Sequence, residues 1–146
     1  MGRIAVFLLL VGAARGEFLR IEVFMRDMNC PSCTDSMAAA FKRLRGVEKV
    51  EIDQDHGSVR LELAKPNRIS VEQVWDTVKR IGFTPGETRV TVHGNVKKDA
   101  AKTSIEVTEL GRTYEVEGAA AGDDVSIQGV ITPPPDPRTA IRIRVQ

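Results

Sequence analysis

Hydrophobic and polar residues in the first half of the chain follow two different periods. A two-residue alternation over residues 18–25, FLRIEVFM, predicts a β-strand. From Pro31 the spacing becomes helical and predicts a helix that Gly46 ends. The apolar residues on the inner face of this helix are Met37, Phe41 and Leu44.

The same two periods then recur. Alternating runs at 50–52 and 59–63 flank a turn sequence at 55–58, and so predict a β-hairpin. Ser70 and Gln73 form a capping box that opens a second helix, and Gly82 ends it. One apolar face of that helix carries Val71, Val74, Val78 and Ile81, and the alternating run TRVTV follows.

The order strand, helix, strand, strand, helix, strand over residues 17–93 is the split βαβ arrangement. We therefore predict an α+β, ferredoxin-like βαββαβ domain, in which a four-stranded antiparallel sheet has both helices on one side. The first loop of this domain carries both cysteines of the chain.

Residues 94–146 show no helical period. They contain five short alternating runs separated by Gly, Asp and Pro, namely VTVHGNV (which begins at Val90), TSIEVTEL, TYEVEG, DDVSIQGVI and AIRIRVQ. These predict a second, small all-β domain, a barrel or sandwich. The spacing of glycine and apolar residues in 92–96 and 122–131 is similar to that of an OB-fold barrel, whose glycines let strands bend. The proline run 132–137, TPPPDP, predicts a stiff exposed loop or a partner motif.

The N-terminus has the plan of a secretory signal peptide over residues 1–16. Arg3 precedes an apolar run from Ile4 to Val11 that is too short to cross a bilayer, and small residues follow it. We expect export to the periplasm or outside the cell, without stable membrane insertion after cleavage. Removal of this segment changes the formal net charge from +1 to about −1, which offers no field for nucleic acid.

Cys30 and Cys33 are the only cysteines and lie where the first helix is predicted to begin. Backbone amides and the helix dipole at such a position favour thiolate over thiol. Two thiolates without a nearby histidine suit a two-coordinate soft ion, Cu(I) or Hg(II), better than zinc, which wants four ligands. A low coordination number also leaves room for a partner's cysteines, so the metal could pass by ligand exchange.

Two other readings of the cysteine pair stay open. An exported thiol-disulfide oxidoreductase uses such a pair at a helix start, and a disulfide could form as the resting state without metal. The two hypotheses differ in electron flow, because the enzyme would turn over a disulfide substrate. The sequence contains no general acid and base pair, phosphate loop or nucleophile triad, so we predict a protein that is not an enzyme.

The loop and its surroundings resemble the heavy-metal-associated domain of copper chaperones, metal-pumping ATPases and the periplasmic mercury-binding protein. The family pattern Gly-Met-x-Cys-x-x-Cys matches residues 27–33, DMNCPSC, except that Asp27 replaces the glycine. Further matches are LRGV at 44–47 with the following Val50, and IGF at 81–83. The resemblance implies Cys30 and Cys33 as metal ligands and a metal-transporting ATPase, efflux component or other metal acceptor as partner.

Four other residues have a predicted role near this site. Met28 is interpreted as a core plug below the loop, since a thioether fills apolar gaps well. Phe83 packs beside the loop in the resemblance and would shield the sulfurs. His56 is expected in an exposed turn, with an auxiliary metal site as the alternative, and His93 where the two halves meet. The native metal is left open among copper, mercury, zinc and cadmium.

Overall fold

The computed structural model describes residues 16–26, 28 and 30–146. The predicted signal peptide, apart from Gly16, lies outside these residues, as do Asp27 and Asn29. The elements in chain order are β1 (Glu17–Met25), α1 (Pro31–Lys42), β2 (Val47–Asp53), β3 (Ser58–Leu63), α2 (Val71–Ile81), β4 (Pro85–Lys98), β5 (Thr103–Val107), the 3-10 turn η1 (Thr108–Leu110), β6 (Arg112–Glu117), β7 (Gly122–Ile131) and β8 (Arg142–Val145).

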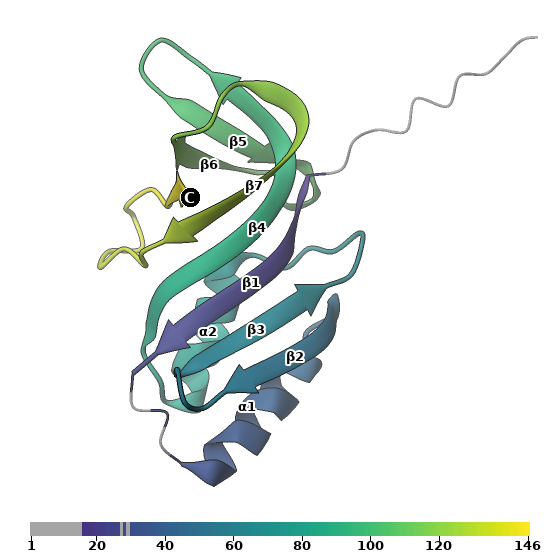
Figure 1. Ribbon diagram of the computed structural model, residues 1–146, viewed down its shortest axis with the longest axis vertical. Helices are drawn as coiled ribbons and strands as arrows, with labels where there is room; N and C mark the ends of the chain where they lie inside the picture. Colours follow the sequence, from purple (N-terminus) through teal and green to yellow (C-terminus); the bar gives the residue numbers. More distant parts are fainter. Residues whose placement is uncertain (1–15, 27, 29) are drawn as a thin grey trace, which may run out of the picture.

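The first half of the chain has the predicted ferredoxin-like order. Strands β2, β3, β1 and β4 are neighbours in that order, every pair is antiparallel, and α1 and α2 pack side by side against this part of the sheet (Figure 1). Ser70 Oγ accepts a hydrogen bond from the Gln73 N–H at 3.2 Å, which caps α2. Gly82 ends α2 with a φ of 102°, a left-handed conformation that suits glycine. Both predicted signals are therefore confirmed.

Helix α1 ends earlier than the sequence predicts. Its last residue is Lys42, and the chain then turns through residues 43–45 before it reaches Gly46, whose φ is 104°. The Leu44 N–H donates to Phe41 O at 3.1 Å and the Val47 N–H to Leu44 O at 3.2 Å. These i to i−3 hydrogen bonds tighten the chain into turns, so Gly46 ends the connection rather than the helix.

The second half closes into a five-stranded barrel. Strands β4, β5, β6, β8 and β7 are hydrogen-bonded in that order, and the pairing of β7 with β4 completes the ring. Strands β6 and β8 are parallel, whereas the other four pairs are antiparallel. Each of the five predicted runs contains or overlaps one of these strands, and of the two predicted forms the structure has the barrel; that it is a separate all-β domain stays a prediction.

The two halves share a strand. Figure 1 shows β4 as one long arc that starts in the four-stranded sheet and ends in the barrel. The domain boundary predicted between residues 93 and 94 falls inside this strand, so backbone pairing is continuous across it. Whether each half folds by itself stays a prediction.

Side chains also join the barrel to the helical layer. The rings of Phe18 on β1 and Tyr114 on β6 meet edge to face at 5.5 Å. The Tyr114 hydroxyl donates to Glu72 on α2 at 3.0 Å, and Arg112 forms an ion pair with the same carboxylate at 2.8 Å. Because Tyr114 is only 3% exposed, α2 and the barrel share one continuous core.

Gly94 and Gly129 allow the barrel strands to approach one another. A Cβ atom on Gly94 would lie 2.4 Å from Glu106 O, and one on Gly129 would lie 2.5 Å from a methyl group of Ile143. Real side chains do not tolerate such contacts, so glycine is required at both positions. The glycines that the sequence offered as bend positions therefore act by letting backbones pack closely.

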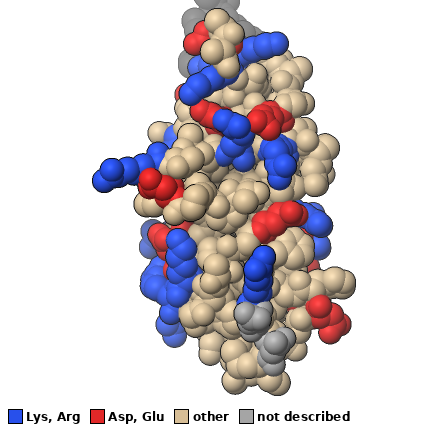
Figure 2. All heavy atoms as spheres, turned by 90° about the vertical axis from the view of Figure 1, so that its left-hand side faces the viewer, with Lys and Arg blue, Asp and Glu red and all other residues tan. Residues whose placement is uncertain are grey.

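Charges of both signs are interspersed over the surface. Figure 2 shows Lys and Arg beside Asp and Glu over the upper and middle parts of one face. On the sheet, Arg20 pairs with Glu62 at 2.8 Å and Arg60 with Glu22 at 3.2 Å. Charges of opposite sign therefore lie close together both on the face in Figure 2 and on the sheet, and neither presents an extended field of one sign. Within the described residues, neither helix has the length and hydrophobicity needed to span a membrane.

Candidate metal site

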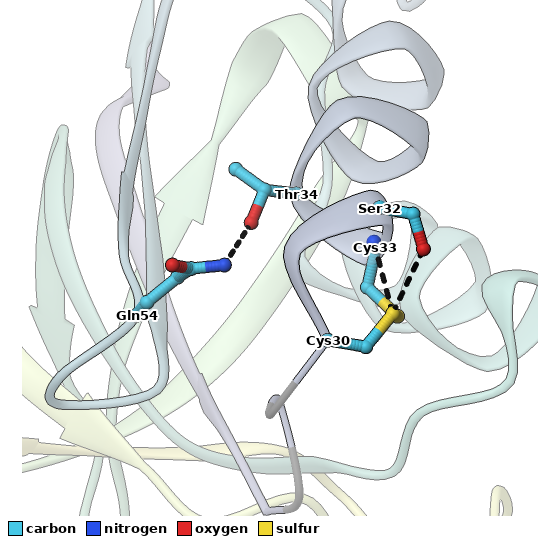
Figure 3. Close-up of a disulfide and its surroundings, with 5 residues drawn as sticks. All are labelled: Cys30, Ser32, Cys33, Thr34 and Gln54. Carbon is cyan, nitrogen blue, oxygen red and sulfur yellow. Dashed lines mark hydrogen bonds between the residues drawn. A yellow bond between two sulfur atoms is a disulfide. The ribbon is translucent and has the colours of Figure 1, made fainter.

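Cys30 occupies the N-cap position of α1. Its backbone is extended, with φ −114° and ψ 126°, and Pro31 begins the helix. Proline suits this first position because its φ is already helical and its missing N–H has no partner to lose. The Cys33 N–H donates to Cys30 Sγ at 3.1 Å, so a sulfur atom takes the place of the oxygen that usually caps a helix (Figure 3).

The helix that carries this cap is firmly anchored. Met37 and Phe41, one and two turns beyond the cysteines, are both fully buried. No acidic residue occupies the first turn of α1, so no carboxylate of that turn opposes negative charge on sulfur. The chain therefore holds Cys30 Sγ at the positive end of a helix dipole, where the thiolate form is favoured.

The two cysteines are joined in a disulfide. Their Cα atoms lie 5.2 Å apart, and the Ser32 hydroxyl lies 3.2 Å from Cys30 Sγ. Both cysteines are half-buried, whereas Pro31 and Ser32 are exposed. Among the described residues there is consequently no free thiol. Metal binding through this pair requires prior reduction, which frees two thiolates that one ion can bridge.

The turn between β2 and β3 supports the cysteine loop from both ends. The Met25 N–H donates to Gly57 O at 2.8 Å, just before the loop. The Gln54 side chain donates to the Thr34 hydroxyl at 2.5 Å, just after Cys33 (Figure 3). A Cβ on Gly57 would lie 2.7 Å from Met25 O, so this close approach also needs glycine. Sequence reasoning identified the turn but gave no signal that it holds the loop.

Met28 and Phe83 lie where packing residues would. Met28 is 3% exposed and belongs to the hydrophobic core, as expected for a residue that fills space below the loop. Phe83 is half-buried against the same core, and it lines a groove with Arg26 and Pro85 at the end of β1. Their predicted influence on the metal stays a prediction.

His56 and His93 each contact a carboxylate and are not grouped with the cysteines. His56 Nδ1 lies 2.7 Å from Asp53 Oδ2 in an exposed turn. Hydrogen bonds from the His56 side chain and backbone hold the pKa of Asp53 below its usual value. No three Cys, His, Asp or Glu side chains in the described part of the chain are grouped as a metal site, so the auxiliary site predicted at His56 has no further ligands there.

His93 belongs to the strand that both halves share, as predicted. Its Nδ1 lies 2.8 Å from the Ser126 hydroxyl on β7, and its Nε2 contacts Asp124. Asp124 has a φ of 55°, and its N–H donates to the Asn95 side chain at 2.9 Å. His93 therefore helps to fasten β7 to β4 at the barrel wall. These partners are about 30 residues away in sequence, so periodicity gave no signal for them.

Part of the chain is similar to known proteins. No family model matches the chain. The copper chaperone CopZ of Staphylococcus haemolyticus is 34% identical over 59 residues, which are 40% of this chain and 85% of that relative.

Several solved structures are similar to part of the chain. One is a CopZ metallochaperone, with a TM-score of 0.42 and 18% identity, which covers 45% of this chain and 97% of its own. Another is a copper-binding domain of HMA7, a P-type ATPase, with a TM-score of 0.42 and 22% identity over 49% of this chain and 90% of that domain. The sequence match to CopZ decides the assignment: through the matched segment, the chain belongs to the heavy-metal-associated family of that copper chaperone.

Proposed function

We propose that the protein is a non-enzymatic carrier of Cu(I), which it binds through the thiolates of Cys30 and Cys33 and passes to a partner. The observation that carries this proposal is the position of Cys30 Sγ as the cap of α1, 3.1 Å from the Cys33 N–H. The match to a copper chaperone supports copper in particular. Hg(II), Zn(II) and Cd(II) are the alternative ions, since all bind paired thiolates.

The chemistry follows from two ligands on one short loop. An external dithiol reduces the disulfide by two electrons and is itself oxidised to a disulfide. This yields two thiolates at the helix N-terminus, and one Cu(I) ion accepts both as ligands. A thiolate of the acceptor protein then bonds to the ion, after which one of the carrier's own sulfur–metal bonds breaks. Repetition of this step transfers the ion without any change in its oxidation state.

We also propose the setting in which this occurs. The protein is exported to the periplasm or secreted after cleavage of residues 1–16, as the basic and apolar N-terminus suggests. Its acceptor is a metal-transporting ATPase or an efflux component. The barrel is an OB-like docking module, supported by its five strands and by the parallel pairing of β6 with β8.

The experiment is a Cu(I) titration of reduced residues 17–146 against a competing chelator, beside a Cys30→Ser/Cys33→Ser double variant. We expect tight binding of about one ion per chain that disappears in the variant, since two thiolates fill a two-coordinate ion. Parallel titrations with Hg(II), Zn(II) and Cd(II) rank the metals.

The rival function is thiol-disulfide exchange, which the disulfide between Cys30 and Cys33 favours. A catalytic amount of the oxidised protein is therefore incubated with a reduced dithiol peptide, with oxidised glutathione as the terminal electron acceptor and with a copper chelator. Catalytic turnover of the peptide, together with weak Cu(I) binding that the double variant does not change, would replace the carrier with an oxidoreductase.

A further inference from the structure

A groove of about 630 Å³ lies between α2, the first half of β6 and the connection from β7 to β8. Its volume is within the range of pockets that hold ligands. Tyr114 and Trp75 lie at its buried side, and three consecutive prolines, Pro133 to Pro135, line the connection. Cys30 and Cys33 are not among its lining residues, so the groove is separate from the candidate metal site.

The backbone of β6 has an open edge along this groove. Strand β8 begins only at Arg142, which pairs with Glu115, and the Glu115 N–H donates to Ile141 O at 3.3 Å. Backbone groups two residues apart in a strand point to the same side, so the N–H and C=O of Thr113 also point away from β5. Thr113 is exposed and has no β8 partner. This edge can pair with an extended backbone from another chain.

The wall formed by α2 offers two charges without partners. Asp76 and Lys79 are exposed and lie three residues apart on the helix, and their side chains form no ion pair or hydrogen bond among the described residues. Neighbouring charges are already neutralised, because Glu72 pairs with Arg112 and Glu115 with Lys102.

The spacing of these two charges matches that of an extended peptide. Helix side chains three residues apart are separated by about 5–6 Å, and alternate side chains on one face of a strand by roughly 6.8 Å. A strand with opposite charges at alternate positions would therefore complement Asp76 and Lys79. The residue between those charges points away from α2. The prolines that also line the groove offer an apolar surface for an aromatic side chain at that position.

We propose that this groove binds an extended peptide segment of a partner protein, which adds as a strand to the Thr113 edge of β6. An aromatic residue of the segment packs against the proline connection, and oppositely charged residues on either side of it pair with Asp76 and Lys79. This function goes beyond metal carriage and does not depend on it.

The test uses the capped peptide Ac-Thr-Lys-Phe-Glu-Thr-NH2, titrated into isotope-labelled residues 17–146 and followed by amide NMR shifts. We expect saturable shifts at Thr113 and its neighbours in the groove. Replacement of Phe by Ala in the peptide should weaken binding about tenfold, which is 1.4 kcal/mol. The Cys30→Ser/Cys33→Ser variant should bind the peptide unchanged, so failure of the metal proposal would leave this result intact.

Two protein variants make the test specific. Thr113→Pro removes the donor N–H at the open edge and should abolish binding. The exchange Asp76→Lys/Lys79→Asp lies on the exposed side of α2, so it should leave the fold intact; it should weaken binding about fivefold and favour the peptide with Lys and Glu exchanged.

Three results would overturn the proposal. One is the absence of saturable shifts at millimolar peptide. The second is binding that neither the charge exchange nor Thr113→Pro alters, which would indicate nonspecific contact. The third is self-association of the peptide-free protein with Thr113 at the contact, which would make a second copy the occupant of the groove.

Discussion

Cys30 Sγ accepts a hydrogen bond from the backbone N–H of Cys33, the residue with which it also shares a disulfide. This hydrogen bond gives the two sulfurs unequal surroundings, because only Cys30 is the N-cap of α1. After reduction of the disulfide, an amide and the helix dipole together therefore stabilise the thiolate of Cys30.

We expect Cys30 to be the more reactive thiol once the disulfide is reduced. The Cys33→Ser variant, which retains Cys30, should react with iodoacetamide at neutral pH roughly ten times faster than Cys30→Ser. Rates from mass spectrometry of each single variant provide the comparison, and both unfolded variants in urea serve as the control. Equal rates in the folded state would show that the cap does not activate the sulfur.

The sequence identified the cysteines and the order of elements because both signals are local. Ser70 and Gly82 determine the ends of α2 through contacts with residues a few positions away. The alternating strand patterns are likewise visible within a few consecutive residues. The support of the cysteine loop could not be predicted in this way, since Gln54 reaches Thr34 across 20 residues of chain. Such a contact depends on where the β2–β3 turn lies in the folded sheet.

Gly94 shows how a glycine can suggest a wrong domain boundary. A glycine inside an alternating run reads as a bend or a boundary, and the predicted domain division falls beside it. In the structure β4 continues through Gly94, where the missing side chain lets Glu106 O approach. A glycine is indeed needed at this position, but the reason is close packing between strands and not a boundary between domains.

Replacement of Gly94 therefore tests the closure of the barrel. Gly94→Ala should lower the free energy of unfolding by about 2 kcal/mol, because its Cβ would overlap Glu106 O and force the strands apart. Urea denaturation measures the loss. Gly111→Asn is the matched control, since a Cβ there meets no atom within 4 Å and asparagine tolerates its φ of 61°. Equal losses would contradict close packing at Gly94.

Tyr114 should make the protein less stable in alkali. Burial, and secondarily the negative charge of Glu72, raise the pKa of Tyr114 above its ordinary value of 10.0. Below pH 10 the phenol is neutral in both states and its contribution is fully present. Above pH 10 the unfolded chain loses this proton while the folded chain keeps it, so stability falls as pH rises.

Tyr114→Phe isolates this effect. At neutral pH it should cost about 1.5 kcal/mol, because it removes the hydroxyl donated to Glu72. Above pH 10 the difference in the free energy of unfolding between the unsubstituted protein and Tyr114→Phe should shrink, since only the unsubstituted protein has a phenol that ionises on unfolding. Tyr114 is the single tyrosine, so tyrosinate absorption reports its titration directly. Ionisation at its ordinary pKa in the folded protein would contradict the expected shift.

Truncation tests whether the two halves fold independently. A chain of residues 17–98 keeps β4 but loses β7, which pairs with β4 from Thr88 to Val96. It also loses Tyr114, and with it the contacts to Phe18 and Glu72. We expect the fragment to be less stable than residues 17–146 by at least about 3 kcal/mol, because a buried aromatic side chain is removed. We also expect it to self-associate through the exposed β4 edge. Urea unfolding and sedimentation measure the two effects, and a monomeric fragment of unchanged stability would establish two independent domains.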